Sequence, residues 1–296
     1  RPAKPLALMA SEAVLARFAT PTEAEWTLLR DPGAPIVLIA GRGDLPEGLA
    51  PGQAGLGWML PYTPLHHLLC AAMDRPLVMT SANVSGAPQV IGNAEARATL
   101  AGIADAMVLH DREIARRLDD SVMRAHPPMV LRRARGQVPG TLPLPPGLPD
   151  RQVLACGGQL KSAICLVKGG QALLSHHMGD LDHPDCLTEY DRACADYAAL
   201  FDHQPQAVTV DLHPDFAATR HGQARAGAGG LALIGVQHHH AHMAAAMGEG
   251  GWPAEGGAVA GIVLDGLGLG PDGTVWGGEL LLGDYAHVTR AAWLKP

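Results

Sequence analysis

A proline-rich segment divides this chain of 296 residues into two parts. Five of the twelve residues from Val138 to Pro149 are proline, which can continue neither a helix nor a central strand. We therefore predict a semi-rigid linker over residues 139–150. It would separate a domain at residues 1–138 from a second domain at residues 151–296, and the chain is long enough for two domains.

The first part alternates short apolar runs with helical patterns, which is typical of an α/β domain. We expect strands at residues 36–39, 77–79, 107–109 and 129–131, and helices at residues 64–73 and 94–103.

The second part begins with three closely spaced apolar runs. We expect strands at 152–155, 163–167 and 172–175, with turns at Gly157-Gly158 and Gly169-Gly170. Helices at 186–201, 216–225 and from 238 onward then alternate with strands at 207–212, 231–236 and 259–264. A three-stranded meander followed by alternating helices and strands suits one half of an actin- or sugar-kinase-like (ASKHA) nucleotide clamp, and only one half is present.

Four histidines lie within residues 238–242, at the start of an expected helix. His238 and His242 are four positions apart, so both rings can point at one metal ion. The zinc-peptidase pattern H-E-x-x-H needs Glu after the first His, where this chain has His239. The pair is therefore a candidate metal site, and a solvated polar run at a helix start is the alternative.

Polar segments of the first domain are candidates for binding a phosphorylated ligand. Ser81 and Asn83 directly follow an expected strand, where open α/β sheets bind ligands. Ser121, Arg124 and Arg133 lie in two further polar segments, and guanidinium groups bind phosphates through paired hydrogen bonds. An ordinary turn and a basic surface patch are the alternatives.

The first glycine-rich loop of the second domain is a candidate phosphate contact. Gly157 and Gly158 allow close backbone approach, and Lys161 adds a positive charge to the same turn. Most glycine-rich turns are ordinary hairpins, so that alternative stays open.

A second glycine-rich loop follows the last expected strand. Asp265, Gly266 and Gly268 would form a turn in which Asp265 could hold a metal ion or a ribose. Two further polar blocks, at 176–181 and 211–215, would either line a cleft or act as helix caps and turns.

The bulk composition narrows the class of protein. A formal charge of −7 argues against a nonspecific nucleic-acid binder. Five scattered cysteines without a C-x-x-C pair suit a reduced cytoplasmic protein. No apolar run approaches the ~20 residues of a membrane span. We therefore expect a cytoplasmic protein with neither a membrane nor a nucleic acid as partner.

Taken in order, these segments resemble the hydrogenase-maturation carbamoyltransferases, the HypF family, essentially from end to end. Arg1 and the residues after it look like the end of the K-x-R-P motif of a YrdC-like domain. Other segments resembling that domain lie at 80–86, 119–124 and 132–139. Segments resembling the Kae-type domain lie at 154–161, 176–181, 211–216, 236–244 and 265–281.

The resemblance implies a two-step reaction. The YrdC-like domain would join carbamate, derived from carbamoyl phosphate, to ATP as carbamoyl adenylate. The Kae-type domain would transfer the carbamoyl group to the C-terminal Cys of a partner, HypE. An acylphosphatase domain and a zinc-finger segment would precede residue 1, so any further zinc is expected only upstream.

The resemblance also assigns roles to the candidate residues. His238 and His242 would hold iron or zinc, with a third ligand, an Asp, beyond Pro296, and His239 and His240 would be secondary contacts. Mg²⁺ would accompany ATP. Lys161 and Asp265 would be catalytic. The nucleotide- and carbamoyl-binding residues would be Arg1, Ser81, Asn83, Ser121, Arg124, Arg133, Gly157, Gly158, Gly266 and Gly268.

The chain departs from the family pattern at two positions. Gln159 stands where the motif G-G-E-L-K has Glu, which removes a charge. Leu267 stands where the motif D-G-T-G has Thr, which removes a hydroxyl. Both changes put the nucleotide-handling role of these two positions in doubt.

Three other classes compete with this interpretation. An antibiotic O-carbamoyltransferase acts on a small alcohol with the same two modules in reverse order. A threonylcarbamoyl-adenylate enzyme of tRNA modification normally divides them between two chains. A regulatory nucleotide-binding protein would bind the nucleotide without any chemistry.

Overall fold

A computed structural model describes residues 4–41, 43–84 and 86–295. Arg1, a predicted ligand-binding residue, therefore lies outside the described residues. The chain forms two compact units, Arg1–Pro139 and Gly140–Pro296. Within the described residues, no helix has the length and apolar character that crossing a membrane requires.

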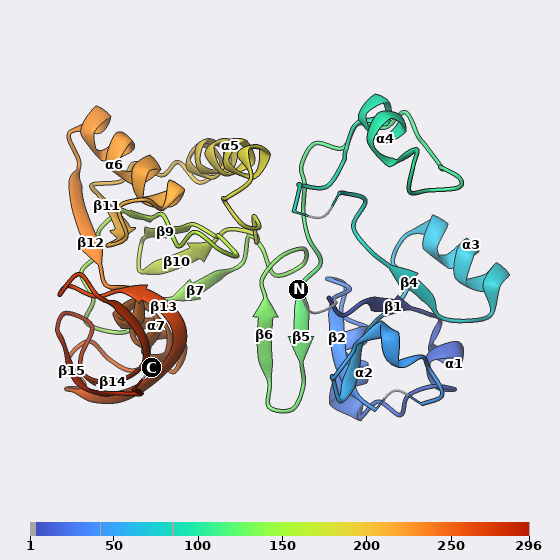
Figure 1. Ribbon diagram of the computed structural model, residues 1–296, viewed down its shortest axis with the longest axis horizontal. Helices are drawn as coiled ribbons and strands as arrows, with labels where there is room; N and C mark the ends of the chain where they lie inside the picture. The colour runs from blue at the N-terminus through green and yellow to red at the C-terminus, as the bar shows by residue number, and fades with distance from the viewer. Residues whose placement is uncertain (1–3, 42, 85, 296) are drawn as a thin grey trace. The chain divides into compact units, whose positions relative to one another are not determined.

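The first unit is built on a six-stranded mixed sheet with strand order β4-β1-β3-β2-β5-β6. Figure 1 labels five of these strands: β1, β2, β4, β5 and β6. Its strands are β1 (Ala7–Met9), β2 (Ile36–Ala40), β3 (Gly55–Met59), β4 (Leu77–Met79), β5 (Val122–Arg124) and β6 (Met129–Arg132). Its helices are α1 (Glu12–Leu15), α2 (Glu23–Leu29), α3 (Pro64–Met73) and α4 (Asn93–Leu100), with a 3₁₀ turn at Glu47–Leu49. The pairs β1–β3 and β2–β5 are parallel.

Local sequence explains where the helices of this unit begin. Thr22 and Glu25 form a reciprocal capping box at the start of α2. Thr63 caps α3, and Pro64 occupies the first turn, where its missing N–H costs no hydrogen bond. Trp58 of β3 is fully buried in the core beneath the sheet.

Most elements expected in this unit are confirmed, and one is wrong. The predicted strands at 36–39, 77–79 and 129–131 match β2, β4 and β6. The strand predicted at 107–109 is irregular, and Val108 is 79% exposed. A short apolar run becomes a strand only where a neighbour can pair with its backbone, and this one has no place in the sheet.

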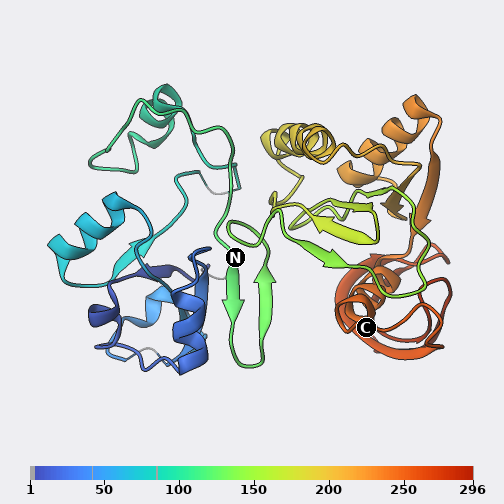
Figure 2. The same cartoon turned by 180° about the vertical axis from the view of Figure 1, so that it is seen from behind.

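The second unit contains two sheets (Figure 2). The larger has the order β12-β11-β8-β9-β10-β7 and the smaller β13-β14-β15. The strands are β7 (Thr141–Pro143), β8 (Val153–Ala155), β9 (Cys165–Lys168), β10 (Gln171–Leu174), β11 (Ala207–Asp211), β12 (Ala232–Val236), β13 (Val259–Leu269), β14 (Val275–Gly283) and β15 (Val288–Trp293). The helices are α5 (Pro184–Leu200), α6 (Ala217–Gly229) and α7 (His238–Glu249).

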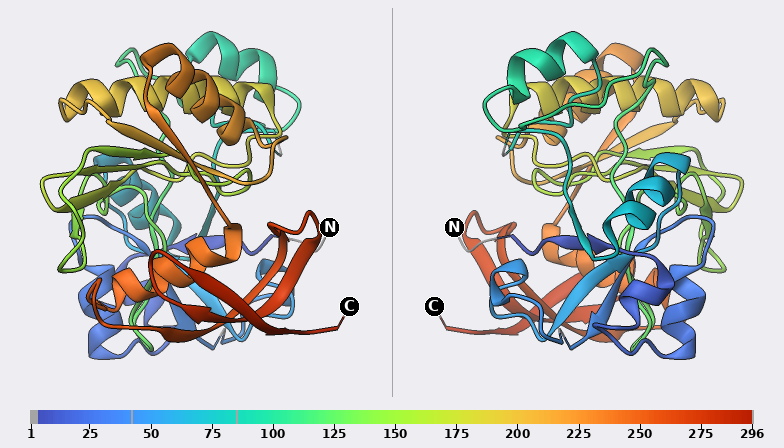
Figure 3. Two further views of the ribbon diagram at one scale, coloured as in Figure 1. Left: turned by 90° about the vertical axis from the view of Figure 1, so that its left-hand side faces the viewer. Right: turned by 90° about the vertical axis from the view of Figure 1, so that its right-hand side faces the viewer.

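The larger sheet combines a meander with a parallel half, as the sequence pattern indicates. β8 and β9 pair antiparallel, as do β9 and β10, whereas β8, β11 and β12 are parallel. Figure 3 shows α5 and α6 together beside this sheet. Buried residues of both helices share one hydrophobic core with the strands, including Tyr190, whose hydroxyl donates to the Cys156 carbonyl at 2.7 Å.

Part of the segment predicted as a linker is β7, which lies within residues 139–150. β7 pairs antiparallel with β10, and Pro143 stands opposite Gln171. Because β7 is at the edge of its sheet, Pro143 need not donate to a further strand. The proline rule excludes a central strand and does not exclude this edge strand.

The predicted turn at Asp265, Gly266 and Gly268 is also wrong, since all three residues lie inside β13. The ladder with β14 is interrupted there: Leu264 pairs with Gly278 and Gly268 with Trp276. More residues of β13 than of β14 occupy this interval, which is the property of a β-bulge. Glycines therefore mark an irregularity within the strand and not its end.

Candidate metal centre

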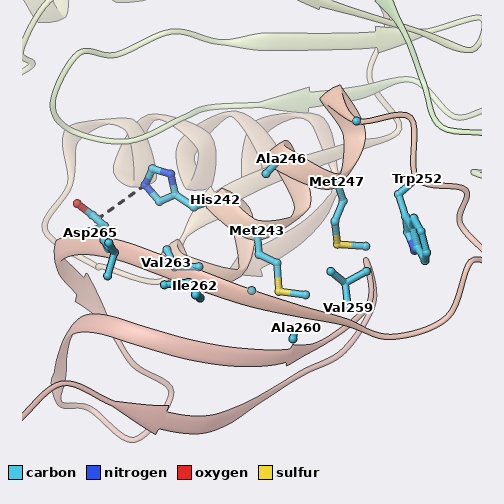
Figure 4. Close-up of a pocket in the computed structure, with 13 residues that line it drawn as sticks. His242, Met243, Ala246, Met247, Trp252, Val259, Ala260, Ile262, Val263 and Asp265 are labelled. Carbon is cyan, nitrogen blue, oxygen red and sulfur yellow. Dashed lines mark ion pairs between the residues drawn. The ribbon is translucent and has the colours of Figure 1, made fainter. Parts of the chain in front are cut away.

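His238, His242 and Asp265 come together in the second unit. Their ligand atoms all lie within 4.8 Å of one another. His238 Nε2 is 3.0 Å from Asp265 Oδ2 and 3.3 Å from His242 Nε2. His242 Nε2 is 3.7 Å from Asp265 Oδ2, the ion pair drawn in Figure 4. The predicted convergence of the two histidines on one point is therefore present.

The helix start places the two histidine rings. The Gln237 side chain caps α7 by accepting from the His240 N–H at 2.8 Å, so His238 is the first helical residue. One helical turn then brings His242 onto the same face. Asp265 reaches them from the bulge of β13, which packs beside α7 through the core of Met243, Met247 and Val263.

A fourth residue, Asp211, orients the first ligand. It ends β11 with its side chain buried, and Oδ2 lies 2.6 Å from His238 Nδ1. Its other oxygen accepts from the His213 N–H at 2.8 Å. A carboxylate can only accept, so Nδ1 carries the proton and Nε2 faces Asp265. The sequence leaves residues 211–215 open between a cleft lining and a turn, and their place at the end of an expected strand is the feature that points to a site.

The two ligand histidines have opposite electrostatic environments. The hydrogen bond that His238 donates to the Asp211 carboxylate raises the pKa of His238, and burial opposes this effect. Burial lowers the pKa of His242, and the neighbouring His238 lowers it further. Both effects favour the neutral form of His242, which is the form that binds metal ions. His238 is oriented by its hydrogen bond to Asp211.

The donor set fits a divalent transition metal. Two imidazole nitrogens and one carboxylate oxygen occur in both catalytic zinc sites and non-haem iron sites. A carboxylate on the far nitrogen of a ligand histidine, as in Asp211–His238, is the usual outer support of such sites. The structure places Asp265 among the candidate ligands, in agreement with the expectation that it could hold a metal ion. Its catalytic role and the Asp ligand expected beyond Pro296 stay predictions.

A cavity of about 650 Å³ opens beside the centre, between α7 and β13 (Figure 4). His242 and Asp265 stand at one end of it. Its other walls are mainly apolar and include Met243, Met247 and Trp252. A small molecule bound in this cavity would contact His242 and Asp265 at one end and apolar side chains elsewhere.

The first glycine-rich loop lies against the centre. A Cβ on Gly158 would be 3.8 Å from Cε1 of His238. Gly157 has a φ of +72°, and a Cβ there would come within 2.2 Å of the Ala163 carbonyl oxygen.

Lys161 of the same loop also has a positive φ, and its N–H donates to Asp180 at 2.9 Å. The turn predicted here is a longer loop, at 156–164, whereas Gly169-Gly170 is the β9–β10 turn.

Gln159 is a structural link in this loop. Its amide nitrogen donates to Asp182 and its amide oxygen accepts from the N–H of Ala217, both at 2.7 Å. The Ala217 N–H is the first of α6, so the side chain joins the loop to that helix. Leu267, the other departure, is 71% exposed in the bulge of β13.

The predicted residues of the first unit have mainly local contacts. Ser81 donates to Asn83, whose amide donates to the carbonyls of Val84 and Ala87, so this loop is closed on itself.

Ser121 is fully buried, and its hydroxyl donates to the Arg135 carbonyl while accepting from the Ala134 N–H. Its hydroxyl is therefore already engaged with the backbone. Arg124 donates to the Pro127 carbonyl, and Arg133 donates to the Gln137 carbonyl.

Arg135 belongs to the arginine-rich segment at 132–136, in which the sequence predicts only Arg133 as a ligand-binding residue. It pairs with Asp120 at 2.6 Å, donates to the Gly33 carbonyl, and lies 3.8 Å above the Tyr62 ring. It thereby ties three separate segments of the first unit together.

Three family models match consecutive parts of the chain. Residues 1–134 match the model described as "Telomere recombination", the Sua5–YciO–YrdC family. Residues 149–249 match the HypF Kae1-like domain, and residues 261–296 match the second subdomain of the carbamoyltransferase Kae1-like domain.

Individual relatives agree with this order. The chain is 68% identical to the carbamoyltransferase HypF of Rhodobacter capsulatus, covering 100% of the chain and 40% of the relative. It is 40% identical to HypF of a Synechocystis strain, with 100% and 38% covered.

Two solved structures also match. One is full-length HypF in a phosphate- and nucleotide-bound form, with a TM-score of 0.89, 38% identity, and 98% of this chain and 45% of that chain covered. The other is HypF of T. kodakarensis, with a TM-score of 0.90, 35% identity, and 99% and 38% covered.

The fold and the site therefore define a protein in which a YrdC-like α/β domain precedes a Kae1-like domain. The chain belongs to the HypF family of carbamoyltransferases, and it spans about two-fifths of the length of the curated relatives it matches.

Proposed function

We propose that this chain carries the carbamoyl-adenylate-forming domain and part of the carbamoyl-transfer domain of a cytoplasmic hydrogenase-maturation enzyme. Carbamate, derived from carbamoyl phosphate, attacks the α-phosphorus of ATP through its oxygen. Pyrophosphate leaves with the electron pair, and carbamoyl adenylate remains. The thiolate of the C-terminal Cys of HypE then attacks the carbamoyl carbon, and AMP leaves.

The observation that carries this proposal is the His238–His242–Asp265 cluster with its Asp211 support, within a chain that matches both HypF domains. The order of the two domains favours HypF over the O-carbamoyltransferases, in which we expect the reverse order. Iron or zinc would be held by these three side chains, with Mg²⁺ accompanying ATP. A metal ion held there would polarise the carbamoyl carbonyl as a Lewis acid.

The residues around the cluster would prepare the site for the transfer step. Asp211 fixes the His238 ring with Nε2 toward the cluster. The apolar walls formed by Met243 and Met247 would exclude water, which matters because a carbamoyl adenylate is prone to hydrolysis. Gly158 leaves room beside His238 for a phosphate or carbamoyl group.

The proposed activity is tested with the full-length protein. ATP–pyrophosphate exchange that depends on carbamoyl phosphate is expected, together with transfer of labelled carbamoyl to HypE. A protein that only binds nucleotide would show no exchange.

The variant His238→Ala separates the two steps. We expect it to lose bound metal and carbamoyl transfer and to keep the exchange reaction. Unchanged metal content in this variant would contradict the proposed centre.

A further inference from the structure

His239 is the most deeply buried member of the histidine run, although it lies between the candidate ligands in sequence. It is fully buried, whereas His242 is exposed. A buried polar ring is costly unless its nitrogens are satisfied. In this chain both are: Nδ1 lies 3.1 Å from the Gln237 amide nitrogen, and Nε2 lies 3.4 Å from the Asp265 carbonyl oxygen.

The neighbouring contacts fix the direction of these hydrogen bonds. The Gln237 oxygen accepts from the His240 N–H, so its amide nitrogen is the group that faces His239. An amide nitrogen only donates, so Nδ1 of His239 accepts. Nε2 therefore carries the proton and donates to the Asp265 carbonyl, which can only accept. The His239 ring is thus held with its proton on Nε2 and with Nδ1 as the acceptor.

The partner of His239 is the backbone of a candidate ligand. Asp265 lies where the ladder between β13 and β14 is interrupted, so its carbonyl needs a partner from outside that ladder. His239 supplies it from α7. The Gln237 amide also donates to the Leu269 carbonyl at 3.4 Å, beyond the other side of the bulge. The start of α7 is therefore tied to β13 at two points, at Asp265 within the bulge and at Leu269 beyond it.

Close packing reinforces this link. A Cβ on Gly268 would come within 2.6 Å of Cε1 of His239 and 2.9 Å of Cβ of His238, so only glycine allows α7 to lie this close to the bulge. The Trp276 ring lies against His239 on another side, with 6.1 Å between ring centroids. The ring has little room to move.

We propose that His239 is a positioning residue that holds Asp265 at the correct distance from His238 and His242. It binds no metal itself, because both of its nitrogens are engaged by Gln237 and Asp265. This inference rests on the proposed function, because it concerns the same metal centre. Outer supports of metal ligands typically contribute about 10- to 100-fold to metal affinity.

The test measures Zn²⁺ affinity by chelator competition in the full chain. His239→Phe keeps an aromatic ring of somewhat larger volume and removes both hydrogen bonds, and we expect affinity to fall about 10- to 100-fold. His239→Gln keeps an N–H donor for the Asp265 carbonyl, and we expect it to restore most of the loss. Gly268→Ala should also weaken Zn²⁺ binding, although it replaces none of the candidate ligand residues.

The matched control is His240→Phe. His240 Nε2 lies 2.8 Å from the carbonyl oxygen of Asp284, a residue outside the cluster, so this variant loses an equivalent hydrogen bond. We expect Zn²⁺ affinity to stay within a few-fold of native. The absorption spectrum of bound Co²⁺ should change in His239→Phe and not in His240→Phe.

The outcomes separate this inference from the proposed function. Native affinity in His239→Phe, or an equal loss in His240→Phe, would overturn the positioning role and leave the proposed centre standing. If the native chain and His238→Ala bound Zn²⁺ with equal affinity, the proposed metal centre would be wrong. The positioning role of His239 would then be wrong as well.

Discussion

The Asp211 carboxylate lies 2.6 Å from Nδ1 of His238, while Nε2 of the same ring lies 3.0 Å from Asp265. One imidazole therefore connects the end of β11 with the bulge of β13. The first contact places a proton on Nδ1, and the second places Nε2 at the cluster. Two sheets of the second unit thus meet at one ligand side chain.

Replacing this support should weaken metal binding. Asp211→Asn keeps an oxygen acceptor but loses the charge that polarises the ring, so we expect Zn²⁺ affinity to fall about 10- to 100-fold. Chelator competition measures the change. Asp215→Asn, at an exposed position four residues later, is the control and should bind as the native chain does. Equal affinities for the two variants would show that Asp211 does not support the site.

The loop beside His238 should depend on Gly157. Gly157→Ala combines a φ of +72° with a Cβ 2.2 Å from a carbonyl oxygen, and we expect a loss of about 3 kcal/mol in unfolding free energy. Gly169→Ala, with a φ of +58° and open space around it, should lose only about 1 kcal/mol. Urea denaturation of both variants separates the steric contact from backbone strain. Similar losses would mean that the Ala163 contact relaxes easily.

Gln159 should resist replacement by the glutamate of the family motif. In Gln159→Glu two carboxylates would face each other where the amide now donates to Asp182, and we expect a loss of about 1 kcal/mol. Adding Asp182→Asn returns a donor and should recover most of that loss. A double-mutant cycle measures the coupling. Full additivity of the two substitutions would contradict the predicted interaction.

Acid should weaken the small sheet through one ion pair. Arg290 of β15 makes two hydrogen bonds to the buried carboxylate of Glu279 in β14, and these lower the Glu279 pKa. A group whose folded pKa is lowered stabilises the fold above its ordinary pKa, and that contribution disappears as the pH falls through the folded value. The contribution is therefore full at neutral pH and shrinks below about pH 4.5.

The variant Glu279→Gln tests this directly. It leaves Arg290 without its buried partner, so we expect a loss of about 3 kcal/mol at pH 7 that narrows as the pH falls below 4.5. Urea denaturation across pH 3–7 is the measurement, in steps of about half a unit. Glu255→Gln, at an exposed position, should show little loss at any pH. A loss that stays constant down to pH 3 would exclude the ion pair as its source.

The sequence alone determined most of the local structure and half of the candidate site. Apolar runs at 36–39 and 207–212 became strands, because buried strands need a continuous apolar face. The four-residue spacing of His238 and His242 placed both rings together, because helix geometry depends only on position in the chain.

Tertiary structure decided what distant segments contribute. Asp211 and Asp265 are 27 and 23 residues away from the nearer ligand histidine in opposite directions, and no local rule brings them there. Asp211 reaches His238 because β11 pairs into the large sheet. Asp265 reaches both histidines because β13 has a bulge at that position. The same bulge explains why a glycine-rich stretch that looks like a turn lies inside a strand.

The roles within the histidine run show this division most clearly. Spacing selects His238 and His242, but His239 and His240 are equivalent in sequence and differ only in their surroundings. His239 faces the β13 bulge in the core, and His240 faces the Asp284 carbonyl. A side chain's partners depend on which elements pack against its helix face, and that is fixed by the fold as a whole.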